Sequence, residues 1–147
     1  MWLIVDRLYL GDREDAENLV GLQKEGITHV INCTRMPCFY PDHFNYLHLE
    51  LDDPDPRFGA LIPEVCAYID EARGKGKVMV HCAAAVSRSP SVILAYLSHQ
   101  GQSLSTAWDF LLDRAPQVNP AALFWHQLVE HYGPGPTNGL FEPDLMQ

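Results

Sequence analysis

Hydrophobic and polar residues alternate along this chain with two different periods, and these periods predict where strands and helices lie. Short β-branched or alternating stretches predict strands at 2–5, 8–10, 27–32, 46–51 and 77–81. Apolar residues at helical spacing predict helices over about 12–24, 63–73, 88–99, 103–114 and 120–132. The first two strands can equally be one bent strand, because only Asp6 and Arg7 separate them.

Capping and breaking residues set the predicted ends of these elements. Asp12 is placed to cap the first helix and Gly26 to end it, while Ser103 is placed to cap the fourth helix. Pro63 suits the first turn of the second helix, where the missing N–H has no partner to lose. The stretch 52–56, Asp-Asp-Pro-Asp-Pro, forbids regular structure and predicts an exposed acidic turn.

The order of these elements predicts an α/β domain with a mixed, mainly parallel central sheet of four to five strands flanked by helices. A chain of 147 residues fits one domain of this kind. We expect residues 1–132 to form that domain. Gly, Pro, Asn and Asp dominate residues 133–147, which predicts a flexible tail.

Composition narrows the classes of partner. The formal charge of −9 argues against a general binder of nucleic acid or of membrane surfaces. The four cysteines, at 33, 38, 66 and 82, form neither a disulfide framework nor the spacing of a zinc site. No apolar run is long enough to cross a membrane, so we expect a cytoplasmic protein.

The candidate chemistry lies in one stretch, from His81 to Pro90. A strand that breaks into a short loop and then opens a helix aims successive backbone N–H groups at one point, where the helix dipole adds positive potential. Cys82 begins this loop and Arg88 ends it. We interpret the loop as a phosphate site in which Cys82 is the nucleophile.

Each residue of the loop suits that chemistry. The helix N-terminus, the N–H groups and Arg88 all favour the thiolate form of Cys82, and a guanidinium holds two phosphate oxygens at once. Ser89 is placed to donate a hydrogen bond to the sulfur and ease its departure in a second step. The residues between the cysteine and the arginine are small enough for their amides to reach the oxygens, and they are Ala83, Ala84, Ala85, Val86 and Ser87.

Phosphoryl transfer to sulfur also needs an acid that protonates the leaving oxygen. The acidic turn offers Asp52, Asp53 and Asp55. Alternation along the preceding strand puts Asp53 on the same face as Leu51, pointing inward, and the neighbouring carboxylates favour its protonated form. We therefore assign the acid to Asp53, with Asp52 as the alternative.

The segment His81-Cys82, five residues, Arg88-Ser89 resembles the signature loop of the cysteine-based protein tyrosine phosphatases, and its flanks resemble the small dual-specificity branch. Residues 8–11, 26–32 and 124–128 also resemble that branch, so the similarity covers about residues 3–132. It implies a protein tyrosine phosphatase-like fold and a two-step reaction without cofactor or metal. Cys82 would form a cysteinyl-phosphate while Asp53 protonates the leaving group, and Asp53 would then help water to hydrolyse it.

The resemblance also implies partners and supporting residues. The expected substrate is a phosphorylated protein or peptide carrying phosphotyrosine, phosphoserine or phosphothreonine, and the expected state is a monomer. His81 would order the loop and favour the thiolate rather than act as a base. In some members of the superfamily a second cysteine near the position of Cys33 forms a reversible disulfide with the nucleophile. Cys33 can also be a packed small hydrophobic residue, which is the interpretation we favour.

The chain departs from the family pattern at two positions. Ala85 stands where the family usually has glycine, and if this position needs a positive φ, a Cβ there costs about 1–2 kcal/mol. Ala121 follows Pro120 where the family usually has asparagine, and Asn119 lies before that proline instead. Both departures bear on the rate rather than on the type of reaction.

Alternative functions stay open at this point. A pseudophosphatase would bind phosphorylated partners without hydrolysing them, and Ala85 is the residue that favours it. A phosphatase for inositol lipids or RNA 5′-phosphates ranks lower, because residues 83–87 carry no charge and the acidic chain has no basic track. A sulfurtransferase-like fold also uses a loop cysteine, but it predicts neither Asp53 nor Ser89.

Overall fold

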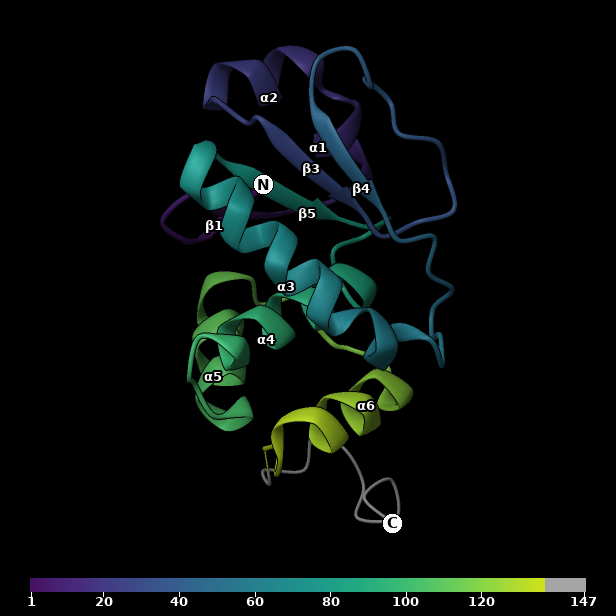
Figure 1. Ribbon diagram of the computed structural model, residues 1–147, viewed down its shortest axis with the longest axis vertical. Helices are drawn as coiled ribbons and strands as arrows, with labels where there is room; N and C mark the ends of the chain where they lie inside the picture. Colours follow the sequence, from purple (N-terminus) through teal and green to yellow (C-terminus); the bar gives the residue numbers. More distant parts are fainter. Residues whose placement is uncertain (137–147) are drawn as a thin grey trace.

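In the computed structural model, which describes residues 1–136, a five-stranded sheet forms the centre of the molecule (Figure 1). The order across the sheet is β1-β2-β5-β3-β4; β1 and β2 are antiparallel and the other neighbours are parallel. The strands are β1 (Trp2–Val5), β2 (Leu8–Gly11), β3 (His29–Asn32), β4 (Asn45–His48) and β5 (Val78–His81). The predicted α/β class with a mixed, mainly parallel sheet is confirmed.

Helices cover both faces of the sheet, which is why the strands alternate between two hydrophobic clusters. The helices are α1 (Arg13–Glu17), α2 (Leu19–Glu25), α3 (Phe58–Lys75), α4 (Arg88–His99), α5 (Leu104–Arg114) and α6 (Ala122–Tyr132). In β5, Val78 and Val80 join the large cluster with α3 to α6, whereas Met79 joins the small cluster with α1 and α2. Alternation of side chains along a strand requires this division.

Two predicted helices have different bounds in the structure. The predicted helix over 12–24 is two helices, because the Asn18 side chain accepts a hydrogen bond from the N–H of Gly21 and caps α2. Helix α3 begins at Phe58, earlier than the predicted start near Pro63. Phe58 is buried and packs edge-to-face on Phe124 at 5.3 Å, so its burial draws another turn of chain into the helix despite the proline.

The predicted strand over 46–51 is also shorter. Backbone hydrogen bonds from Leu49 to Asn32 and from Leu51 to Cys33 continue the pairing beyond β4. Glu50 lies between them with φ +51°, a left-handed conformation, while Leu49 and Leu51 on either side of it stay buried. The alternation ends after Leu51, because Asp52 and Asp53 are both exposed, so the inward orientation predicted for Asp53 is wrong.

The most buried helix follows the most central strand. Every residue of α4 from Ser89 to Ser98 is buried, and β5 has neighbours on both sides. Gly101, with φ +106°, and Ser103, whose side chain accepts a hydrogen bond from the N–H of Thr106, separate α4 from α5 as predicted. The loop between β5 and α4 thus begins and ends on rigid elements.

The chain ends are described only in part. Gly135 and Pro136 are buried, whereas most of the predicted tail, 137–147, lies outside the described residues. Within residues 1–136, no helix is both long and apolar enough to cross a membrane.

Candidate active site

The loop from Cys82 to Ser87 leaves the carboxyl end of the central strand β5 and enters the N-terminus of α4. Open α/β sheets place their ligands at this edge. The N-terminus of a twelve-residue helix presents unpaired N–H groups and positive potential to whatever lies in front of it.

The hydrogen bonds of the loop are distributed unevenly between its carbonyls and its amides. Among residues 1–136, carbonyl oxygens of the loop accept hydrogen bonds from groups outside it. The donors are the N–H of Arg13 to Ala83 (2.9 Å), Nε2 of Gln117 to Ala85 (3.1 Å), the N–H of Asn119 to Val86 (2.7 Å) and the N–H of Ser91 to Ser87 (3.1 Å).

The backbone amides show the opposite pattern. No N–H group of residues 83–88 donates a hydrogen bond to an acceptor in the described part of the chain. Unpaired backbone donors are rare in folded proteins. A loop whose carbonyls are hydrogen-bonded to the surrounding chain and whose amides have no partner is therefore suited to bind an anion. Gln117, Arg13 and Ser91 therefore support the loop. The sequence did not reveal the contacts of Gln117 and Arg13, because these are long-range, whereas the backbone and hydroxyl of Ser91 both donate locally to the Ser87 carbonyl.

Cys82 lies at the start of this loop of free amides, with its thiol against the first turn of α4. Its sulfur is 3.0 Å from the hydroxyl oxygen of Ser89, and both residues are buried, Cys82 at 3% exposed. A hydroxyl at this distance can donate a hydrogen bond to a thiolate. The predicted proximity of Ser89 to the sulfur is confirmed.

Arg88 closes the loop at the first residue of α4. Its Nη1 donates a hydrogen bond to the carbonyl of Leu51 at 3.1 Å, which brings the segment before the acidic turn next to the loop. Its Nε is buried and has no hydrogen-bond partner among the described residues. A guanidinium held on one side with donors left over is suited to grip a phosphoryl oxygen.

His81 is buried beneath the loop. Burial lowers the pKa of His81 from its ordinary value, so the imidazole is neutral at pH 7. Its Nδ1 lies 3.2 Å from the carbonyl oxygen of Cys82. This contact suits a residue that orders the loop, and a neutral ring adds no positive charge beside the thiol.

Ala85 has φ +58°, so the conformation that usually calls for glycine is present at this position. Its methyl group is fully buried in the large cluster and does not face outward with Ala83 and Ala84, which are exposed. On the other side of the loop, the N–H of Ala121 donates to Oγ of Ser87 at 2.9 Å. The segment before α6 thus contacts the loop through Ala121 despite the changed residue.

The three aspartates of the acidic turn have three different environments. Asp55 is buried at 1% exposed and pairs with Arg57 at 2.8 Å, so the prediction that the whole turn is exposed is wrong. Asp52 is exposed and pairs with Arg35 at 2.7 Å. Asp53 is exposed and, within the described residues, forms neither a hydrogen bond nor an ion pair.

These environments differ in how well they suit an acid. The hydrogen bond from Arg35 lowers the pKa of Asp52, and the hydrogen bond from Arg57 holds the pKa of Asp55 well below its usual range. Both effects favour the ionised form, which cannot donate a proton. Of the three carboxylates, Asp53 alone is free of a cation within the described chain.

Cys33 lies at the end of β3, where its N–H donates to the carbonyl of His81 at 2.9 Å. Its side chain is fully buried, and burial raises the pKa of this thiol well above the ordinary value. The other cysteines, Cys38 and Cys66, are also free thiols. No group of three or more His, Cys, Asp or Glu residues in the described chain is arranged to hold a metal ion.

Fold and site together define a class: an α/β domain in which a buried cysteine faces a loop of free amides that ends in arginine. Comparison with known proteins agrees. Residues 8–133 match the family "Dual specificity phosphatase, catalytic domain". The chain belongs to this family, whose members are cysteine-based protein phosphatases.

Individual relatives show the same similarity. The chain is 37% identical over 147 residues to MAP kinase phosphatase with leucine-rich repeats protein 2 of Dictyostelium discoideum, covering 99% of this chain and 20% of that protein. It is 34% identical over 133 residues to human dual specificity protein phosphatase 6, covering 86% and 35%. The crystal structure of human DUSP28 superposes with a TM-score of 0.82 at 28% identity, over 90% and 95% of the two chains. The chain thus spans only part of the curated relatives that it matches.

Proposed function

We propose that this chain is a dual-specificity protein phosphatase that hydrolyses phosphomonoesters through a cysteinyl-phosphate intermediate. The observation that carries the proposal is the set of six free N–H groups, at residues 83–88, around the end of a strand that delivers Cys82. Such a loop stabilises the three charged oxygens of a phosphoryl group throughout its transfer.

In the first step the thiolate of Cys82 attacks phosphorus, a P–S bond forms and the P–O bond to the substrate breaks. Asp53 gives its proton to the departing oxygen. Arg88 and the amides of Ala83 to Ser87 hold the phosphoryl oxygens. The freedom of Asp53 from any cation supports its assignment, since the carboxylates of Asp52 and Asp55 are held ionised by arginines.

In the second step water attacks phosphorus and the P–S bond breaks. The ionised Asp53 takes a proton from the water, and the leaving thiolate accepts a hydrogen bond from Ser89. The 3.0 Å separation of Ser89 Oγ and Cys82 Sγ supports this role. His81, neutral and hydrogen-bonded beneath the loop, would keep the loop in place during both steps.

The proposed substrates are proteins or peptides that carry phosphotyrosine, phosphoserine or phosphothreonine. Membership of the dual-specificity family supports this choice. We also propose that the chain acts as a cytoplasmic monomer without a nucleic-acid or membrane partner. The net charge of −9 supports the absence of those two partners.

Packing is the role we favour for Cys33, and its alternative role as a redox partner of Cys82 can be tested with peroxide. Peroxide would oxidise Cys82 to a sulfenic acid, and the Cys33 thiol would then attack that sulfur, forming a disulfide and releasing water. The backbone N–H of Cys33 donates to the carbonyl of His81, the residue before Cys82, and this contact supports the proximity of the two cysteines. Peroxide-treated wild type should regain its activity with a dithiol more completely than Cys33→Ser; equal recovery would leave Cys33 a packing residue.

The experiment that tests the proposed function compares wild type with Cys82→Ser on a small aryl phosphate. A serine hydroxyl is a far weaker nucleophile than a thiolate, so the variant should lose turnover by a factor of about 1,000 or more. If the wild type turns over no faster than the folded variant, the chain is a phospho-binding module instead. In that case both proteins should still bind an aryl phosphate.

A further inference from the structure

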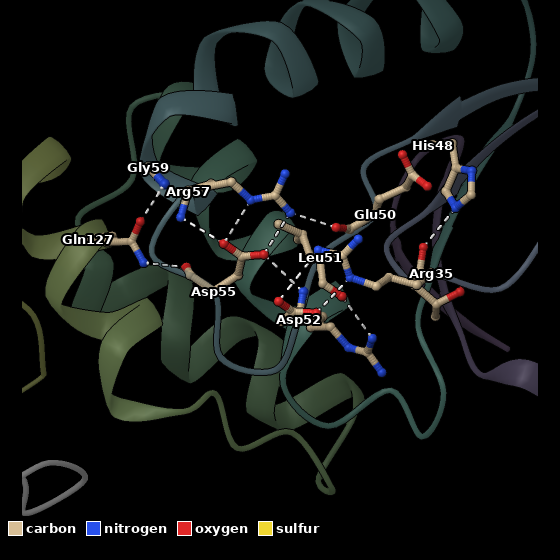
Figure 2. A network of polar contacts seen from close by, with 11 residues as sticks. Arg35, His48, Glu50, Leu51, Asp52, Asp55, Arg57, Gly59 and Gln127 are labelled. Carbon is tan, nitrogen blue, oxygen red and sulfur yellow. Dashed lines mark hydrogen bonds and ion pairs between the residues drawn. The ribbon is translucent and has the colours of Figure 1, made fainter.

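The backbone on both sides of Asp53 is joined by the side chain of Arg57 (Figure 2). Nη2 of Arg57 donates hydrogen bonds to the carbonyl of Glu50 at 2.7 Å and to Oδ2 of Asp55 at 2.8 Å. Its Nε reaches Oδ1 of Asp55 at 3.1 Å. The segment that carries Asp53 therefore runs as a closed turn between two points fixed by a single planar group.

The carboxylate of Asp55 accepts hydrogen bonds from the backbone of the same turn on both sides of Asp53. One carboxylate oxygen accepts the N–H of Asp52 at 3.0 Å and the other accepts the N–H of Arg57 at 2.8 Å. The carboxylate is buried, and such groups are costly to bury unless each oxygen finds donors. Here both oxygens are satisfied, one from each side of Asp53.

Gln127 fastens this turn to α6. Its Nε2 donates to the carbonyl of Asp55 at 2.9 Å, and its Oε1 accepts the N–H of Gly59 at 2.6 Å (Figure 2). A Cβ at position 59 would approach Oε1 to 3.2 Å, so glycine leaves the room that this contact needs. Gln127 is itself nearly buried, at 9% exposed.

We propose that Asp55, Arg57 and Gln127, here called the clasp, are positioning residues that fix where Asp53 presents its proton to the leaving group. This inference rests on the proposed role of Asp53. The clasp donates to and accepts from the chain on both sides of Asp53, and within residues 1–136 none of its hydrogen bonds goes to the phosphate loop. It therefore bears directly on the acid, whereas its link to the phosphate grip is indirect and runs through the carbonyl of Leu51, which accepts a hydrogen bond from Nη1 of Arg88.

The clasp is also separable from the packing of its helices. The contact between α3 and α6 next to it is made by Phe58 and Phe124, whose rings meet at 5.3 Å in the core. Loss of the Gln127 amide should leave that contact in place. A variant at this position can thus lose the positioning of Asp53 while the domain stays folded.

The test uses two substrates that differ in their need for an acid. Phenyl phosphate has a leaving group about as basic as the tyrosine side chain, whereas para-nitrophenol leaves without a proton. Gln127→Met and Arg57→Met should lower kcat/KM for phenyl phosphate by about 10-fold or more and for para-nitrophenyl phosphate by less than about 3-fold. In an Asp53→Asn background, the same substitutions should have little further effect on phenyl phosphate.

A matched control lies at the other end of α3. Lys75 forms an ion pair with Glu71 at 2.8 Å, the same separation as in the Arg57–Asp55 pair, but far along the helix from Asp53. Lys75→Met should change neither rate. Arg57→Lys keeps the charge but loses the planar fork, so it should behave like Arg57→Met.

The outcomes are distinct. Equal losses on both substrates would show that the clasp only stabilises the fold, and unchanged rates would show that it has no role. A further loss in the Asp53→Asn background would show that it does not act through Asp53. An inactive wild type would instead refute the proposed function, independently of the clasp.

Discussion

The hydroxyl oxygen of Ser89 lies 3.0 Å from the sulfur of Cys82, although the two residues are separated by the whole phosphate loop. The contact arises because the loop starts at the end of β5 and returns to the first turn of α4. Both side chains are buried, so the hydrogen bond is not shared with bulk water. A charge-assisted bond of this kind matters most when the sulfur leaves as a thiolate.

Ser89→Ala should therefore slow the second step more than the first. We expect kcat to fall by about 10- to 100-fold, with a burst of phenol product equal to the enzyme concentration before the slow steady state. Stopped-flow measurement with an aryl phosphate checks this. Ser98→Ala removes a buried hydroxyl from the other end of the same helix and should show neither effect. A slow first step with no burst would contradict the assignment.

Ala85→Gly should raise the rate. The left-handed φ costs alanine about 1–2 kcal/mol, and glycine removes that cost from the anion-binding form of the loop. The loss of a buried methyl, about 0.8 kcal/mol, and the greater freedom of glycine, about 0.5–1 kcal/mol, offset this gain in the free energy of unfolding. We thus expect a higher kcat/KM with stability changed by less than about 1 kcal/mol. Ala84→Gly, which relieves no strain, should lower the rate, and an Ala85→Gly rate no higher than wild type would refute the account.

The features that the sequence predicted well have local physical signals. The bounds of α4 and α5 follow from hydrophobic periodicity, from Gly101 as a helix breaker and from Ser103 as a helix N-cap. The central position of the loop follows from the order of elements, because helices alternating with strands favour a mainly parallel sheet. The positive φ at Ala85 was foreseeable only through the resemblance to a family that has glycine there.

The features that the sequence missed depend on contacts between distant residues. The sequence predicts Asp55 to be a solvated turn residue. In the structure it accepts hydrogen bonds from Arg57 and from the N–H of Asp52. Asp53 is exposed because the alternation of buried and exposed side chains ends after Leu51, which the pattern before it does not reveal. The sequence shows Gln127 only as one residue of an amphipathic helix. In the structure its side chain donates a hydrogen bond to the carbonyl of Asp55, 72 residues earlier. Asn18 is the exception, since its capping side chain was a local signal for the break between α1 and α2.

The rate should be highest at mildly acidic pH. The reaction needs Cys82 ionised and Asp53 protonated in the same molecule, so kcat/KM should fall on both sides of an optimum. Asp53→Asn should remove the fall at high pH when a substrate with a basic leaving group is used. A wild-type rate that still climbs between about pH 6 and 9 would contradict this pairing of groups.

Asp55 should make the stability of the domain sensitive to acid. Its folded-state pKa is held well below the ordinary value by Arg57, so its contribution is present above about pH 4 and is lost as the pH falls further. Asp55→Asn should lower the free energy of unfolding at pH 7 by about 1–3 kcal/mol. Urea unfolding at several pH values should show the gap to wild type narrowing below about pH 4. A gap independent of pH would mean that the charge of Asp55 is not what stabilises the turn.

The central claim, that Cys82 carries the phosphoryl group, is tested most directly by rapid acid quench within the first turnover of an aryl phosphate. Mass spectrometry of the digested protein should find one phosphoryl group on the peptide containing Cys82, accumulating further in Ser89→Ala and absent in Cys82→Ser. Turnover with no phosphorylated Cys82 at any time, or with the phosphoryl group on another residue, would contradict the account.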